Sequence, residues 1–253
     1  MATTRRRVSP AAVRDLLLVG LTVSSGAIDA ISFLALGKVF TAFMTGNFVF
    51  LGLGVAGAGG PDVLRVLVAI GAFAAGVLAA TRIVEGSTES GVWPRRVSVA
   101  LGVAMLLQAA FLAVWAATSG HPGTGSGDLL TGLMALAMGT QSGAVMGLAV
   151  KGVFTTAATA TAIFLMRDVA TWSASASERA RTDSPRPNAA PAEHARLVGV
   201  LAGLLAGATA GGLLLVHART YAPALPLVVT AVVIATASIA LHGRIDTGTT
   251  DIE

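Results

Sequence analysis

Polar side chains that could bind a solute or an ion are concentrated near the start of a largely apolar sequence. Thr22, Ser25, Asp29 and Ser32 are spaced by three, four and three residues, which places them on one face of an α-helix. A carboxylate deep inside an apolar helix is costly in lipid and usually faces a bundle interior or a wet cavity. The spacing predicts a cavity wall centred on Asp29. The alternative is that Asp29 only fixes packing, for example by bonding a neighbouring helix end.

A second polar group follows within 20 residues of the first. The sequence MTGN at 44–47 contains Thr45, Gly46 and Asn47, and Thr41 precedes it. Glycine and asparagine tolerate turn conformations, so we expect a break here, with Asn47 capping a half-helix that restarts at Phe48. Backbone that is not helical is tolerated at membrane depth only where protein or water surrounds it. Thr41, Thr45 and Asn47 are therefore candidate ligands for a substrate or ion, with tight packing of a glycine-containing helix as the alternative.

Related residues recur 114 positions later in the chain. Residues 26–51 align without a gap on 140–165 with nine identities, and VFTxxxT is present in both copies. The second copy keeps Thr155 and Thr159 but has Gly143 in the place of Asp29. An internal repeat of this kind predicts two structural halves, at residues 15–118 and 128–242.

Gln141 lies two positions from Gly143, the residue that takes the place of Asp29 in the second copy. Its amide could bond a substrate, or it could bridge two helices, which is the more common use of such a side chain.

Composition indicates the surroundings of these residues. Of 253 residues, 54% are apolar and 12% are charged, and the mean hydropathy is +0.77. Soluble domains carry about 25% charged residues, so the sequence predicts a polytopic membrane protein surrounded by lipid. The net charge is +4 and the pI is near 10.6. We attribute both to basic residues in cytoplasmic loops, so we expect no nucleic-acid partner.

Eight apolar segments divide the chain, and two of them are short and rich in threonine. They lie at 16–36, 40–57, 63–83, 97–118, 129–150, 153–171, 196–217 and 223–242. If the second and sixth segments enter and leave from one side, 14 Lys and Arg residues are cytoplasmic and 3 are outside; if all eight segments cross, the numbers are 11 and 6. The excess of positive charge in the cytoplasm favours the first arrangement.

The expected fold is therefore an all-α membrane bundle of two repeats. It has six full crossings plus two broken or re-entrant segments, and eight crossings is the alternative. With three crossings in each half, the two halves are inverted relative to each other, as in many transporters and channels.

The remaining segments are polar. Residues 1–14 form a basic N-terminus, 174–195 read as a disordered cytoplasmic linker, and 243–253 form a short tail. We expect both termini in the cytoplasm and the protein in the plasma membrane of the cell.

Signals of enzymatic chemistry are absent from the sequence. It has no cysteine, its four histidines lack metal-ligand spacing, and it contains no phosphate-binding loop or nucleophile elbow. We expect neither an enzyme nor a metal site nor a cofactor.

Glycines recur at every fourth position in two segments. They are Gly139, Gly143 and Gly147 in one, and Gly199, Gly203, Gly207 and Gly211 in the other. Such stripes allow close approach of helix backbones, so we interpret them as packing seams inside the bundle, with a homodimer interface as the alternative.

Two stretches, GAIDAISFLALGKVFTAFMTGNFVF and AMGTQSGAVMGLAVKGVFTTAATATAIF, resemble the YoaK family of bacterial integral membrane proteins, a family of unknown function. The matching residues are Gly26, Asp29, Phe40, Thr41, Thr45, Gly46, Asn47, Gly139, Gln141, Thr155 and Thr156. The chain departs from the family at Ser142 and Ala160, where an Asn and a Gly are common.

Two functional hypotheses follow from the sequence. The first is a small-solute or ion transporter or channel with a polar cavity at the middle of the membrane, lined by Ser25, Asp29, Thr41, Thr45, Asn47, Gln141, Thr155 and Thr159. The second is a scaffold or assembly protein without transport activity.

Overall fold

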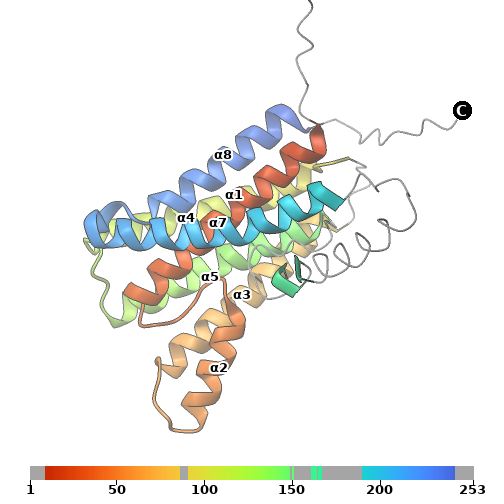
Figure 1. Ribbon diagram of the computed structural model, residues 1–253. Helices are drawn as coiled ribbons and strands as arrows, with labels where there is room; N and C mark the ends of the chain where they lie inside the picture. The colour runs from red at the N-terminus through yellow and green to blue at the C-terminus, as the bar shows by residue number, and fades with distance from the viewer. Residues whose placement is uncertain are drawn as a thin grey trace, which may run out of the picture.

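The computed structural model describes residues 9–85, 91–148, 150, 161–163, 165–166 and 190–242. All regular structure in these ranges is helical. The elements are α1 (Pro10–Ala35), α2 (Met44–Val55), α3 (Val63–Val84), α4 (Arg95–Ala117), α5 (Thr124–Met146), α7 (Ala190–His217), η1 (Arg219–Tyr221) and α8 (Ala224–Ala240). Six of these helices are long and apolar enough to cross a membrane, and they run side by side in one bundle (Figure 1). The prediction of an all-helical membrane bundle is confirmed.

Local capping explains where two of the long helices begin. The Ser9 Oγ accepts a hydrogen bond from the Ala12 N–H at 3.2 Å, and Pro10 occupies the first helical position. α1 therefore begins several residues before the apolar stretch that sequence reasoning used to place it. Asp62 caps α3 in the same way, by accepting from the Arg65 N–H at 3.0 Å.

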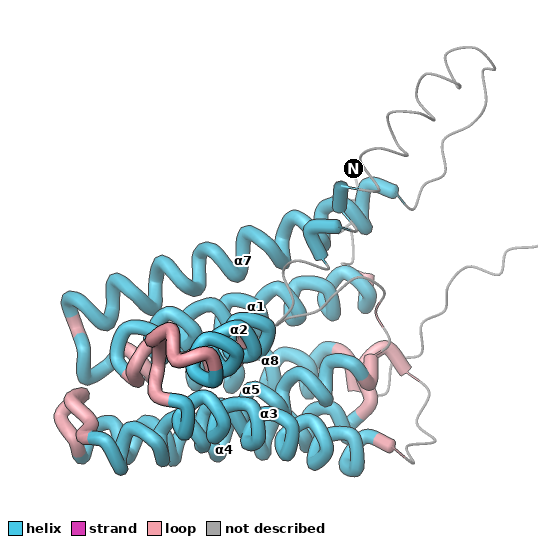
Figure 2. Tube along the Cα trace, turned by 90° about the horizontal axis from the view of Figure 1, so that it is seen from below, coloured by secondary structure: helices cyan, strands magenta, loops and turns pink. Residues whose placement is uncertain are grey.

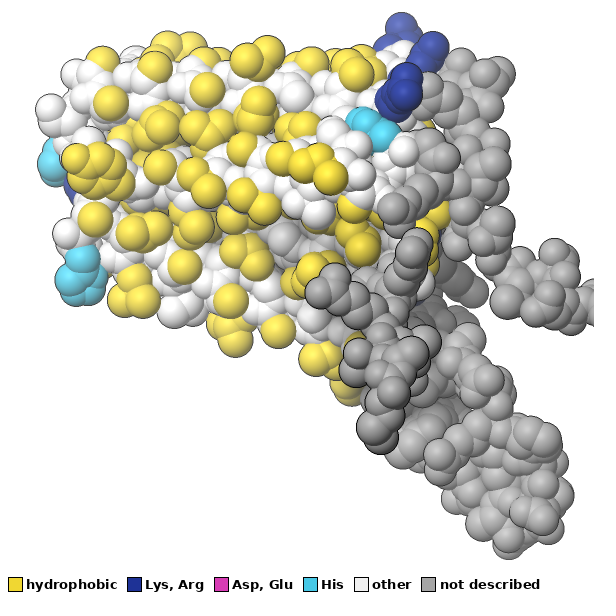
Figure 3. Space-filling model, turned by 90° about the horizontal axis from the view of Figure 1, so that it is seen from above, with side chains coloured by type: hydrophobic (Ala, Val, Ile, Leu, Met, Phe, Trp, Pro, Cys, Tyr) yellow, Lys and Arg dark blue, Asp and Glu magenta, His cyan; other side chains and the backbone are white. Residues whose placement is uncertain are grey.

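Arginines gather at one end of the bundle, which we call the basic end. Arg96 donates to the carbonyls of Ile83 and Glu85, which joins the start of α4 to the end of α3. The described arginines of this end are Arg14, Arg82, Arg95, Arg96 and Arg196. In Figure 3 hydrophobic side chains cover the length of one face, and the main group of Lys and Arg lies at one end of it.

Arg65 marks the opposite end of the bundle, which we call the Arg65 end. Its guanidinium donates to the Leu36 carbonyl at the end of α1 and to Asp128 near the start of α5. The chain thus leaves α1 and enters α3 at the same end. It likewise leaves α5 and enters α7 at the basic end, because Gly147 lies against Val84 there and Arg196 pairs with Asp15. Turns at both ends of the long helices are visible in Figure 2.

Helix packing in the bundle follows the order of the sequence repeat. The two most extensive contacts are those of α1 with α7 and of α5 with α3. Contacts of α1 with α8 and of α5 with α4 come next. Since α5, α7 and α8 correspond in order to α1, α3 and α4, each contact of one pair has its counterpart in the other.

The glycine stripes lie in these two main contacts. A Cβ atom added at Gly207 or Gly211 would collide with the backbone of α1, and one added at Gly139 would collide with the Phe73 carbonyl of α3. The interpretation of the stripes as packing seams inside the bundle is confirmed. Formation of a homodimer stays a prediction.

The chain is irregular between α1 and α2. Residues 36–43 are not helical, Gly37 and Lys38 have positive φ angles of 84° and 64°, and α2 has only 12 residues. Figure 1 shows this segment returning from the end of α1 toward the middle of the bundle, where α2 starts and packs beside α3. The predicted break is thus present, but it precedes Met44. The expectation that Asn47 caps a half-helix restarting at Phe48 is wrong, because Asn47 lies inside α2, whose N-cap is Phe43.

Candidate functional site

The Asp29 carboxylate holds the irregular segment against α1. Its Oδ1 atom accepts hydrogen bonds from the backbone N–H groups of Thr41 and Ala42, at 2.9 and 2.8 Å. These N–H groups have no helical partner of their own, because they lie just before the start of α2. Asp29 therefore fixes the position of the break, as the packing alternative expected. The two bonds use about half of the acceptor capacity of an ionised carboxylate.

Asn47 holds the same segment from the other side. Its Nδ2 donates to the Phe40 carbonyl at 2.7 Å, and its Oδ1 accepts from the Phe40 N–H at 3.0 Å. The side chain is fully buried. An asparagine amide has a donor NH2 group and an acceptor oxygen. Asn47 can therefore bond both the N–H and the carbonyl of Phe40, which lies outside any helix. Asn47 thus positions the site and does not line it.

Three phenylalanine rings surround the break. The rings of Phe33 and Phe40 stack with centroids 5.1 Å apart, and those of Phe40 and Phe43 meet at 78° with centroids 5.3 Å apart. Gly46 gives these rings room, since a Cβ atom added there would lie 2.9 Å from both Phe40 and Phe43. The glycine of MTGN therefore serves aromatic packing and not a turn.

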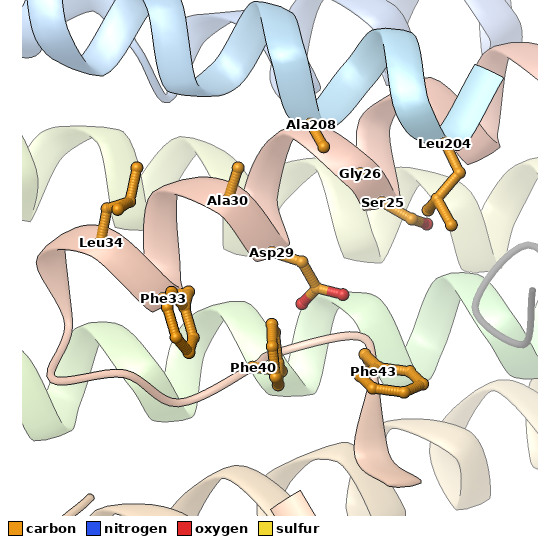
Figure 4. A pocket seen from close by; sticks show the side chains of 10 residues that line it. All are labelled: Ser25, Gly26, Asp29, Ala30, Phe33, Leu34, Phe40, Phe43, Leu204 and Ala208. Carbon is orange, nitrogen blue, oxygen red and sulfur yellow. The ribbon is translucent and has the colours of Figure 1, made fainter. Parts of the chain in front are cut away.

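A cavity of about 490 Å³ adjoins the Asp29 carboxylate. It lies between α1, the irregular segment and α7, and Figure 4 shows the carboxylate on the side of α1 that faces Phe40 and Phe43. From α1 it is lined by Ser25, Gly26, Asp29, Ala30, Phe33 and Leu34. Leu204 and Ala208 of α7 close the side opposite the rings. Only two of these lining side chains, Ser25 and Asp29, are polar.

Ser25 connects this wall to the centre of the bundle. Its Oγ donates to the Leu21 carbonyl at 3.1 Å and accepts from Gln141 Nε2 at 3.1 Å. Gln141 also donates to the Leu21 carbonyl at 3.2 Å, so it joins α5 to α1. Its Oε1 atom is buried and has no partner among the described residues. Gln141 bridges helices, as the more common use of such an amide suggested, and does not line the cavity.

The other predicted ligands are not brought together at the cavity. Thr45 is exposed on α2. Thr41 is buried and its Oγ1 has no hydrogen-bond partner in the described part of the chain, while its N–H binds Asp29. Thr155 and Thr159 lie outside the described residues. The predicted site thus reduces to Ser25 and Asp29 on the cavity wall, with Thr41 and Asn47 behind it.

The polar stripe of α1 is largely satisfied within the helix. Thr22 donates to the Leu18 carbonyl at 2.9 Å, and Ser32 donates to the Asp29 carbonyl at 3.2 Å. Such bonds to the preceding turn are the usual way for a hydroxyl to be accommodated in an apolar helix. Only the middle of the stripe reaches the cavity.

Sequence reasoning missed the aromatic part of the site. The signal was available, because five of the nine phenylalanines of the chain lie between residues 33 and 50. It also missed Gln108 on α4, a fully buried amide whose Nε2 and Oε1 have no partner among the described residues. Gln108 does not line the cavity next to Asp29. The described residues contain no group of three His, Cys, Asp or Glu that could hold a metal ion.

Six lipid-length apolar helices around a half-buried carboxylate define a multi-pass helical membrane protein. The model of the family described as "Protein of unknown function (DUF1275)" matches residues 17–236, so the chain belongs to this family. The chain is 37% identical over 162 residues to the UPF0700 transmembrane protein YoaK of Bacillus subtilis (strain 168), across 64% of this chain and 70% of that protein. The predicted resemblance is confirmed. No solved structure matches the chain.

Proposed function

We propose that this protein moves a small solute or an ion across the plasma membrane, as a transporter or channel. The observation that carries the proposal is the carboxylate of Asp29, which stands inside a lipid-length helix beside a cavity of about 490 Å³. A carboxyl group at that depth is expensive unless it serves a polar pathway or a buried partner. A cavity of this volume is within the range of small-molecule sites.

The backbone next to the cavity supports the same proposal. Residues 36–62 leave and return at the Arg65 end, and the chain between α5 and α7 leaves and returns at the basic end. We interpret residues 36–62 as a re-entrant connection and the six long helices as the full crossings of two inverted repeats. Most of the second predicted re-entrant segment, 153–171, lies outside the described residues. Transporters commonly place a midplane site beside interrupted helices of inverted repeats, where irregular backbone lines the cavity.

The charge of the two ends supports an orientation. Among the described residues, five arginines mark the basic end, while Lys38, Arg65 and Arg219 lie at the other. The positive-inside rule then puts the basic end, and with it both termini, in the cytoplasm.

Water access to the cavity is the property that tests the proposal without knowledge of the solute. The chain has no cysteine, so a single introduced thiol is a clean probe. Ala30→Cys places it on the cavity wall, and Leu205→Cys places it on α7 at a side chain that is 70% exposed toward the lipid. In reconstituted vesicles, a membrane-impermeant thiol reagent should label the first variant and spare the second.

Uptake provides the second test. Vesicles containing the protein would be incubated with a defined mixture of amines, amino acids, sugars and carboxylates, and their contents analysed by mass spectrometry. At least one solute should accumulate with the unchanged protein and fail to accumulate with Asp29→Asn. An unlabelled Ala30→Cys, or uptake that is equal in both proteins, would reject the transport role of this cavity.

A scaffold function is the less supported hypothesis. The glycine stripes that could bind a partner helix are occupied by α1 and α3 of the same chain. No other surface of the described residues favours a particular partner.

A further inference from the structure

We propose that the cavity beside Asp29 binds an organic cation, an ammonium group that carries apolar substituents. This inference rests on the proposed function, because it names the class of solute for the same site. It follows from three properties of the cavity: the sign of its charge, the aromatic side chains next to that charge, and the shortage of other polar groups.

The cavity has one acidic group, and that group has no counter-ion in the described part of the chain. Asp29 is the charged residue of the lining, and Lys, Arg and His are absent from it. The described ion pairs join Arg14 or Arg196 to Asp15, and Arg65 to Asp128, so none of them involves Asp29. The hydrogen bonds from Thr41 and Ala42 come from neutral amides and leave a net negative charge. A ligand that supplies one positive charge would complete this site.

The aromatic rings favour an organic cation over a bare ion. Phe33, Phe40 and Phe43 line the cavity, and the rings of Phe40 and Phe43 meet nearly at right angles. Phe40 is itself stacked against Phe33 and Phe50, with centroids 5.1 and 5.9 Å away, so it holds the aromatic lining in place. Aromatic rings beside a carboxylate attract a cation that has a soft, weakly hydrated surface. Alkylated ammonium groups have that surface, and aromatic cages are a recurrent way to bind them.

The remaining lining excludes other classes of solute. Magnesium and calcium ions need about six oxygen ligands, and the lining offers one carboxylate and one hydroxyl. A sugar would lose many hydrogen bonds to water that Ser25 and Asp29 alone cannot replace. An anion would be repelled by the carboxylate. The apolar side chains of Leu34, Leu204 and Ala208 instead suit a hydrocarbon substituent.

Benzyltrimethylammonium is a suitable probe because it joins a quaternary ammonium group to one aromatic ring. Its matched controls are neopentylbenzene, which has the same shape and no charge, and phenylacetate, which has the opposite charge. Binding would be measured by titration calorimetry on the full chain in nanodiscs. The cation should bind at least tenfold more tightly than either control.

Asp29→Asn tests the role of the charge. The variant keeps the shape of the side chain and an oxygen that can accept from Thr41 and Ala42, and it should weaken binding of the cation at least tenfold. The matched control is Asp62→Asn, which removes a carboxylate at the N-cap of α3, where asparagine caps equally well. That control should bind as tightly as the unchanged protein. Phe43→Leu should also weaken binding of the cation, and by more than binding of neopentylbenzene.

Protection of a cavity thiol separates this inference from the function on which it rests. The cation should slow labelling of Ala30→Cys by the impermeant reagent, whereas phenylacetate should leave the rate unchanged. If the thiol reacts but the cation neither binds nor protects it, the solute class is wrong and the transport proposal stands. If the thiol never reacts with the reagent, the transport proposal itself fails. Equal binding of the cation to Asp29→Asn, or equal binding of its neutral analogue to the unchanged protein, also overturns the inference.

Discussion

The two halves of the molecule share a packing plan but differ at one equivalent position. Asp29 in α1 lies beside an open cavity, whereas its repeat equivalent, Gly143 in α5, lies against α3. A Cβ atom added at Gly143 would come within 2.8 Å of the Ala80 Cβ and 3.0 Å of the Val77 carbonyl. The second half is thus sealed where the first half is open. Among the described residues, sequence symmetry thus conveys the arrangement of helices and not a second acid beside a cavity at this position.

The halves also carry equivalent ion pairs of different strength. Arg65 of α3 binds Asp128 of α5 at 2.6 Å, and Arg196 of α7 binds Asp15 of α1 at 3.4 Å. The two pairs join corresponding helices at opposite ends of the bundle. The first pair is supplemented by bonds from Arg65 to the carbonyls of Leu36 and Thr124, both at 3.1 Å. The Arg65 pair is therefore the shorter of the two, and it also ties α3 to the end of α1.

The largest expected effect comes from placing an acid in the sealed half. Gly143→Asp would push a charged side chain into the contact between α5 and α3, which combines overpacking with burial of an unpaired charge. We expect a loss of about 4 kcal/mol or more of unfolding free energy, seen as little folded protein after purification in detergent.

Two glycine variants provide the controls for that experiment. Gly143→Ala should give a smaller loss, while Gly102→Ala, at a site where an added Cβ meets nothing within 4 Å, should leave the thermal midpoint unchanged. A fully stable Gly143→Asp would contradict the view that the second half is closed at this position.

An intermediate loss of unfolding free energy is expected when the non-helical segment before α2 loses its hydrogen bonds to Asn47. Asn47→Ala leaves the N–H and the carbonyl of Phe40 without partners in a buried region. The expected loss is about 2–3 kcal/mol. Thr45→Ala, two positions away on an exposed side of α2, should change stability by less than about 0.5 kcal/mol. Thermal unfolding in detergent measures both, and equal losses would show that the break does not depend on Asn47.

The smallest effect should distinguish the two ion pairs. Arg65→Ala removes a salt bridge and two bonds to backbone carbonyls, with an expected loss of about 1–3 kcal/mol. Arg196→Ala removes a longer pair, and we expect the smaller loss of about 1 kcal/mol or less. The two variants would be compared by thermal unfolding at the same salt concentration. The reverse order would mean that the basic end is the firmer one.

Sequence reasoning located the helices well because hydropathy and charge are properties of whole segments. The average hydropathy of each segment predicts the six long apolar helices and the short apolar segment after Phe40. The charge distribution also indicated that this segment returns to the side from which it came. The exact place of the break could not be predicted, because it depends on bonds from the Asp29 and Asn47 side chains to backbone groups 7 to 13 residues away, which form only in the folded chain.

The site was predicted only in part for the same reason. Ser25 and Asp29 share a helical face, which the sequence reveals directly. Thr45 and Asn47 were both predicted as ligands, but Asn47 is buried against the protein and Thr45 is exposed on α2. The phenylalanines became part of the site only through folding of the irregular segment against α1, which no periodicity encodes.

The interlaced packing of α1 with α7 and of α3 with α5 bears on how the chain matures. Each of these two contacts joins a helix of the first half to a helix of the second, so neither can form until the second half is being synthesised. α1, which carries Asp29, is synthesised before α7. Its main packing partner α7 begins only at Ala190. Assembly of this contact must therefore await synthesis of α7, and until then the cavity beside Asp29 lacks the wall that Leu204 and Ala208 provide.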